Sequence, residues 1–381
     1  MESENFKPIE GLRAYLAFWV AIGHGLQLSG YLSLPPPFSM LLDGWAPVAV
    51  FMIVSGFVIT HLLSTRKERY GYYITRRFFR LYPAFVFASV IGYFVMGMWS
   101  ETTAAAPWRT AVGWDWYNGY VRSITNQTYH NTLPHLIAHA TMLHSAIPYE
   151  ILPLAAATFL PAAWSISLEW QFYLVAPLLI HATRNFYAMS ASILVFGIGY
   201  WATSRGYLGS YQLNAFLPAA IFYFIVGIAS RLNFEKLRQA RNPIKLVAIA
   251  VMVVLAVTSS APEPLVVWFV FYSLMTFLTH ESGLSKLFNS VFSSDYPRFL
   301  GTISYSLYLL HRPMQVVLGF AAVSLFEMSR PAMFFVQILA VLLALPVAYL
   351  SFEFIERPGI AFGKLMAERK FKRAEVSAVK I

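Results

Sequence analysis

The sequence contains no cysteine among its 381 residues, and only 12% of the residues are charged. The absence of cysteine excludes disulfides, thiolate metal ligands and an acyl intermediate carried on a cysteine. Soluble domains have about 25% charged and roughly 45–50% apolar residues, whereas this chain is 58% hydrophobic. The composition therefore excludes a soluble globular domain and a disordered chain.

Several motifs that carry chemistry are also missing. There is no G-x-x-x-x-G-K-[ST] loop and no G-x-G-x-x-G turn between a strand and a helix, so the chain offers a nucleotide no glycine-rich loop. H-E-x-x-H, G-x-S-x-G and acidic clusters with metal-ligand spacing are absent too, so no metal site and no elbow serine hydrolase is predicted. A bound phosphate group must then be held by arginine side chains.

The chain does contain a series of apolar stretches long enough to cross about 30 Å of hydrocarbon as helices. The sequence predicts an all-α polytopic membrane protein with about ten transmembrane helices. These spans lie near residues 10–30, 45–63, 78–98, 164–182, 187–203, 211–230, 246–260, 265–280, 299–323 and 332–352. Residues 1–9 precede the membrane domain of residues 10–357, and residues 358–381 form a basic cytoplasmic tail.

The distribution of positive charge orients the spans. With both termini cytoplasmic, 23 of the 28 Lys and Arg residues fall on the inner side and four on the outer side, as the positive-inside rule requires. An eleventh crossing through residues 136–160 would invert this pattern. Residues 99–163 are therefore predicted to be an outer loop with a re-entrant or interfacial segment, which must be buried in protein or line a wet cavity. The basic charge indicates membrane lipids, and not nucleic acid, as partners.

Ionisable side chains within spans are candidates for a functional site, because each costs about 2.5–3.5 kcal/mol at a helix centre. Arg13 and His24 lie in the first span, about 16 Å apart along the axis and within about 20° of one face. This layout suits an anionic ligand that enters from the cytoplasm and reaches His24 with its reactive end. The alternative is a snorkelling arginine and an unrelated core histidine.

The ninth span carries a polar stripe, because Ser304, Tyr308 and His311 fall on one helical face. Arg312 lies beside this stripe at mid-depth, where it needs a cavity or a carboxylate partner. Glu169 is one such carboxylate. It lies about 8 Å from the outer end of its helix, where it can also meet sugar hydroxyls.

Two arginines stand three residues apart at the start of the third span. Arg77 and Arg80 face one way, and guanidinium groups suit a bidentate clamp on phosphates. Positive-inside topology explains the same residues without a ligand. The sequence leaves both interpretations open.

Six segments, in this order, resemble the acyltransferase 3 family of bacterial integral-membrane carbohydrate O-acyltransferases. The segments are IEGLRAYLAFWVAIGHG, FMIVSGFVIT, RRFFRLYP, WSISLEWQFYLVAPLL, SYSLYLLHRP and FEFIERP, and the resemblance extends from about Phe6 to Pro358. It implies transfer of an acyl group, commonly acetyl, from cytoplasmic acyl-CoA to a hydroxyl of a glycan or a glycosylated small molecule. It also implies a multi-pass protein of the bacterial inner membrane.

The resemblance implies a role for each matching residue. Catalysis is expected from His24, Arg13 and Glu169. Binding of acyl-CoA, as acetyl-CoA, is expected from Arg77, Arg80 and Arg13, and binding of the acceptor from Tyr308, His311, Ser304 and Trp164. Some family members carry a fused SGNH-type esterase domain. The chain continues for 23 residues after Pro358, so we expect the form without that domain and a separate periplasmic partner where an exported glycan requires one.

Two other functions compete with this interpretation. Ten spans with intramembrane His, Arg and Glu also suit a proton-coupled transporter or a flippase of a glycan or lipid-linked sugar. Inverted repeats and paired broken helices would favour a transporter, and the sequence displays neither. A scaffold whose polar residues only join helices is disfavoured by the shared face of Arg13 and His24.

Overall fold

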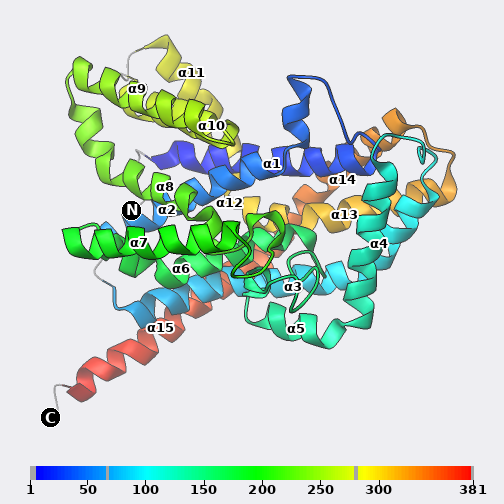
Figure 1. Cartoon of the computed structure of the whole chain (residues 1–381), viewed down its shortest axis with the longest axis horizontal. Coiled ribbons are helices and arrows are strands. Elements are labelled where there is room, and N and C mark those ends of the chain that lie inside the picture. Colours follow the sequence, from blue (N-terminus) through cyan, green and yellow to red (C-terminus); the bar gives the residue numbers. More distant parts are fainter. Residues whose placement is uncertain (1–5, 66–67, 279–281, 379–381) are drawn as a thin grey trace. The chain divides into compact units, whose positions relative to one another are not determined.

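The computed structural model describes residues 6–65, 68–278 and 282–378, with side chains up to residue 370. Arg66 and Lys67 of the predicted inner loop, and Lys380 of the tail, lie outside the described residues. Regular secondary structure in the described part is entirely helical (Figure 1), which confirms the predicted all-α class. Five helices of this part are long and apolar enough to cross a membrane. The count of ten spans and the cytoplasmic placement of both termini stay predictions.

The helices form two compact units. The first unit comprises Met1–Val20, Asp43–Thr65 and Ala220–Tyr305, and the second comprises Ala21–Leu42, Arg66–Ala219 and Ser306–Ile381. The unit boundaries fall within three helices, which are α1 (Lys7–Leu28), α8 (Leu217–Gln239) and α13 (Ser304–Leu325).

The first unit is built on close helix packing. Its further helices are α2 (Trp45–Thr65), α9 (Asn242–Thr258), α10 (Glu263–Phe277), α11 (Gly283–Phe292) and α12 (Asp295–Thr302). Helix α10 packs against α2 and α9, and α9 and α10 lie side by side (Figure 1). A Cβ atom on Gly56 of α2 would lie 2.3 Å from the carbonyl oxygen of Phe224 of α8. Such small residues let two helix backbones approach each other within a membrane.

The second unit is organised around α3. Its elements, besides the ends of α1 and α13, are η2 (Phe38–Leu42), α3 (Tyr70–Ala105), α4 (Trp114–His130), α5 (Thr132–Ala140), η3 (His144–Ala146), η4 (Pro161–Ala163), α6 (Trp164–Ala182), α7 (Phe186–Ser204), η5 (Gln212–Asn214), α14 (Arg330–Ser351), the π-helical turn η6 (Phe352–Glu356) and α15 (Arg357–Ala378). Helix α3 contacts α4, α6 and α15. Its 36 residues extend well beyond the predicted span 78–98, because hydropathy marks only the apolar middle of a helix.

The predicted tail is helical as far as residue 378. Helix α15 packs along α3, and the rings of Phe79 and Phe362 meet edge to face with centroids 5.0 Å apart. Helix–helix packing therefore holds at least the first half of the tail, in addition to any contact with lipid.

The predicted outer segment combines two helices with irregular backbone. Helices α4 and α5 are followed by a stretch in which Met142, Leu154 and Phe159 adopt left-handed φ angles of 54°, 59° and 60°. Such angles are unusual for residues other than glycine. Residues 154–160 are all buried within the second unit. Burial in protein is what irregular backbone at membrane depth requires.

Candidate functional site

Helix α1 carries both members of the R-x10-H pair, as predicted. Arg13 belongs to the part of the helix in the first unit and His24 to the part in the second, and each side chain is partly buried. The continuous helix keeps their separation at about 16 Å along the axis. Their presence on one helix is therefore confirmed, whereas their roles stay predictions.

The imidazole of His24 has a defined hydrogen-bond partner. Its Nδ1 lies 3.2 Å from Oε1 of Gln27, one turn further along α1. Because an amide oxygen can only accept, this contact assigns the proton to Nδ1 and leaves the lone pair on Nε2. The ring also stacks on that of His311 of α13, with centroids 5.5 Å apart and planes 16° apart. His24 is therefore oriented as a neutral imidazole with a basic Nε2.

Arg312 lies next to this histidine pair as a buried cation. Its Nη1 donates to the main-chain carbonyl of His24 at 3.2 Å, and its Nη2 donates to the hydroxyl of Tyr117 at 2.6 Å. The guanidinium also sits over the ring of Trp99, 4.3 Å from the centroid. Only 4% of Arg312 is exposed, and within the described part of the chain it forms no ion pair. The carboxylate partner that the sequence allowed, Glu169, is not among its contacts.

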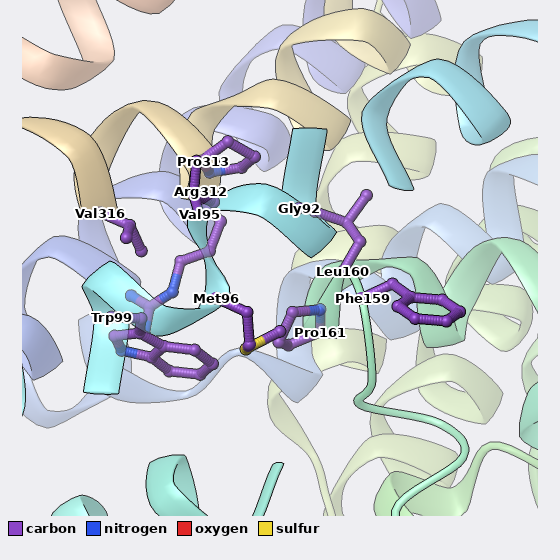
Figure 2. A pocket seen from close by; sticks show the side chains of 10 residues that line it. All are labelled: Gly92, Val95, Met96, Trp99, Phe159, Leu160, Pro161, Arg312, Pro313 and Val316. Carbon is purple, nitrogen blue, oxygen red and sulfur yellow. The ribbon is translucent and has the colours of Figure 1, made fainter. Parts of the chain in front are cut away.

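Arg312 also lines a small cavity of about 10 Å³, space for roughly one water molecule. Figure 2 shows its side chain extending toward Trp99 on one wall of this cavity. The lining residues are Gly92, Val95, Met96, Trp99, Phe159, Leu160, Pro161, Arg312, Pro313 and Val316. Arg312 is the one charged group on an otherwise largely apolar surface.

The predicted polar stripe of α13 is divided between local and long-range contacts. Ser304 donates to the carbonyl of Gly301 at 2.7 Å within the first unit. In the second unit, the hydroxyl of Tyr308 lies 2.8 Å from that of Ser165 and donates to the carbonyl of Ala162 at 2.9 Å. Tyr308 thus joins α13 to the start of α6.

His311 follows Tyr308 by one turn and is fully buried. Its Nδ1 lies 3.3 Å from the carbonyl of Leu307, and its Nε2 has no hydrogen-bond partner in the described structure. Trp164, the first residue of α6, is buried. The structure therefore brings His311 to His24, while no contact given for Trp164 links it to either histidine.

The two arginines of the R-x-x-R motif have different surroundings. Arg80 pairs with Glu356 of η6, whose side chain is fully buried and also accepts a hydrogen bond of 2.9 Å from Ser306. Arg77 lies over the ring of Tyr173, 5.9 Å from the centroid, and its buried Nε has no hydrogen-bond partner in the described structure. Arg80 is thus already charge-paired, whereas Arg77 retains a donor for a ligand.

Glu169 lies on α6 one turn before Tyr173, whose hydroxyl donates to its Oε1 at 2.5 Å. Because Tyr173 also contacts Arg77, the structure connects Glu169 with the R-x-x-R motif through an aromatic side chain. Sequence reasoning placed Glu169 near the outer end of its helix and did not foresee this connection.

Four residues near the site escaped the sequence analysis as participants. Gln27 could have been found, because it follows His24 by three residues on the same helix. Glu356 is visible as an acidic residue at the end of a span, although its pairing with Arg80 is not. Tyr117 and Trp99 carry no signal, because only tertiary packing brings them to Arg312.

Three further histidines cluster in the outer segment, outside the predicted spans. The rings of His139 and His144 stack with centroids 3.9 Å apart, and His135 lies 3.2 Å from the hydroxyl of Thr158. Burial lowers the pKa of His135 and of His139 to about 4, and lowers the pKa of His144 well below its ordinary value. No group of three or more potential metal ligands occurs among the described residues. These histidines form a neutral buried packing cluster.

The family comparison agrees with the order of these elements. A family model described as an acyltransferase domain, that of the acyltransferase 3 family, matches residues 7–352. The matched range contains α1, α3, α6 and α13, on which the residues around His24 and the R-x-x-R motif lie. No curated protein and no solved structure matches the chain.

Proposed function

This chain belongs to the acyltransferase 3 family, and on that premise we propose that it is a membrane O-acyltransferase that uses acyl-CoA as donor. The acyl group is acetyl, and the acceptor is a hydroxyl of a glycan or a glycosylated molecule. We place the enzyme in a bacterial inner membrane, with the donor on the cytoplasmic side. One observation carries the proposal: His24 is held by Gln27 in the tautomer whose Nε2 can accept a proton.

His24 acts in this proposal as the general base. Its Nε2 takes the proton of the acceptor hydroxyl while the hydroxyl oxygen attacks the thioester carbonyl carbon. When the carbon–sulfur bond breaks, His24 returns that proton to the departing thiolate of CoA. A neutral histidine suits this task near neutral pH, and such catalysis contributes roughly 10²- to 10⁴-fold in rate.

The phosphates of acyl-CoA are assigned to the R-x-x-R motif. Arg77 has a buried Nε without a partner in the described structure, which is the kind of donor a phosphate oxygen satisfies. Arg80 adds positive charge, although Glu356 neutralises most of it. That Arg13 also contacts acyl-CoA stays a prediction.

The acceptor is assigned to the residues of α6 and α13. His311, with its unpartnered Nε2, and Glu169, with a carboxylate near the outer end of α6, can both hydrogen-bond a sugar hydroxyl. Tyr308, which is bonded twice already, positions His311 by holding α13 against α6. Trp164 and Ser304 keep their predicted roles in acceptor binding without further support.

The test is thiol release from acetyl-CoA by purified protein in nanodiscs, with and without a glycan extract of the host. We expect glycan-stimulated release by the wild type, its loss in His24→Ala, and a raised KM for acetyl-CoA in Arg77→Ala. His130→Ala is the matched control, because His130 is an exposed histidine that bonds only to the carbonyl of Asn126.

A negative result would identify the alternative. If no CoA appears with any acceptor, while vesicles containing the protein move a glycan across the bilayer, the enzyme proposal fails and the transporter takes its place.

A further inference from the structure

The cavity beside Arg312 has the chemistry of a pocket for a short acyl group. Its walls are largely apolar, including Met96, Leu160 and Val316, and its charged member is a guanidinium at one side (Figure 2). An acetyl thioester has the same division, with an apolar methyl group and a carbonyl oxygen that becomes negative during attack. The cavity therefore complements this group both in polarity and in arrangement.

Arg312 is positioned for a charge that the described structure does not supply. Its guanidinium is buried on Trp99 and donates to neutral oxygens only, those of Tyr117 and of the His24 main chain. A buried cation that lacks a carboxylate is stabilised when negative charge arrives next to it. Fixed donors aimed at developing charge are among the largest contributions to catalysis. The bond to the His24 main chain places this cation next to the residue that serves as base.

The geometry points to the following inference, which rests on the proposed function. The cavity lined by Arg312 and Val316 binds the acyl group of acyl-CoA and restricts it to acetyl, while Arg312 stabilises the carbonyl oxyanion. As the acceptor oxygen attacks, the π electron pair of the carbonyl moves to its oxygen, which lies at the guanidinium. When the tetrahedral species collapses, that pair re-forms the carbonyl, the carbon–sulfur bond breaks, and the ester and CoA leave.

The size of the cavity sets the expected specificity. About 10 Å³ is close to the volume that one water molecule needs, so a methyl group fits with little adjustment and a propyl group does not. One methylene group in an apolar pocket changes specificity about 10- to 200-fold. The wild type should therefore use acetyl-CoA at least tenfold better, in kcat/KM, than butyryl-CoA.

Val316 offers a variant that enlarges the pocket. It follows Arg312 by four residues on α13, so both side chains face the same cavity. Val316→Ala should bring the kcat/KM values for butyryl-CoA and acetyl-CoA at least tenfold closer. Val121→Ala is the matched control, because Val121 is a buried valine of the same apolar cluster that does not line the cavity. It should leave the ratio unchanged.

Arg312 is tested by Arg312→Met and Arg312→Lys. Loss of one oxyanion donor lowers kcat about 10²- to 10³-fold, and we expect this fall for Arg312→Met with little change in the KM for acetyl-CoA. Arg312→Lys should recover part of kcat, because it restores the charge without the planar fork. A purely structural role would instead lower the yield of folded protein and leave kcat per folded molecule unchanged.

The outcomes separate this inference from the function on which it rests. Wild-type enzyme that releases CoA but uses butyryl-CoA as well as acetyl-CoA overturns the inference and leaves the acyltransferase standing; this comparison needs no variant to fold. An unchanged ratio in folded Val316→Ala overturns it too. If the wild type releases no CoA with any donor, both the proposed function and the inference fail.

Discussion

The ion pair between Arg80 and Glu356 allows a stabilising role to be separated from a role in binding acyl-CoA. The side chain of Glu356 is 0% exposed and that of Arg80 is 22% exposed, and Ser306 donates to the second carboxylate oxygen. Removal of the arginine would leave a buried carboxylate without its counter-charge, which costs about 3–5 kcal/mol. We expect Arg80→Met to lower the free energy of unfolding by about 3 kcal/mol, because the hydrogen bond from Ser306 is retained.

The converse change should be milder. Glu356→Gln keeps an oxygen that accepts from Ser306, and the partly exposed guanidinium of Arg80 can turn to water. A hydrogen bond to a charged group contributes roughly 1.5–3 kcal/mol, so we expect a loss of about 1–2 kcal/mol. In the double variant Arg80→Met/Glu356→Leu no charge stays buried, and such replacements are often neutral. The double variant should therefore be more stable than Arg80→Met alone.

The assay is unfolding of the purified protein in detergent, followed by helical circular dichroism against temperature or denaturant. Arg357→Met is the matched control, because its pair with Glu353 has side chains 67% and 27% exposed and should contribute less than about 1 kcal/mol. The reasoning would be refuted by an Arg80→Met protein as stable as the wild type, or by a double variant less stable than Arg80→Met. A stable double variant with a raised KM for acetyl-CoA would show that Arg80 also serves the donor.

Three further predictions concern the same unit. Gln27→Leu removes one neutral hydrogen bond to the imidazole of His24, which contributes about 0.5–1.5 kcal/mol, so kcat in the thiol-release assay should fall roughly 2- to 12-fold; a 1000-fold fall would require a different role for Gln27. Gly92→Ala would place a Cβ atom 2.1 Å from the carbonyl oxygen of Phe159 and should lower the free energy of unfolding by about 1–3 kcal/mol, measured by denaturant unfolding. Burial lowers the pKa of His139 to about 4, below the value of about 6.5 for an exposed histidine, so the unfolded chain binds the extra proton between pH 6.5 and pH 4 and stability must decrease as the pH falls. At pH 5 this amounts to about 2 kcal/mol, and thermal unfolding of His139→Gln should be less sensitive to acid than that of the wild type.

The helical class and most helix positions were accessible from the sequence, because they follow from local hydropathy. The predicted span 164–182 coincides with α6, and span 187–203 lies within α7 (Phe186–Ser204). The spans near 78–98 and 299–323 were less accurate. Helix α3 continues into polar sequence at both ends, and the stretch before Ser304 forms the separate helix α12. Hydropathy reports the solvent of a segment, whereas helix ends depend on hydrogen bonds and packing.

The candidate site divides in the same way between sequence and structure. The sequence by itself determined that Arg13 and His24 share a helix, that Tyr308 and His311 share a face, and that an arginine at position 312 needs a special environment, since all three follow from helical periodicity and the cost of burying charge. Only the tertiary structure decided that Arg312 meets Tyr117 and Trp99 instead of Glu169, that Arg80 is paired with Glu356, and that a small apolar cavity opens beside Arg312. These contacts join residues more than 190 positions apart, and local pattern contains no information on which distant side chains packing will bring together.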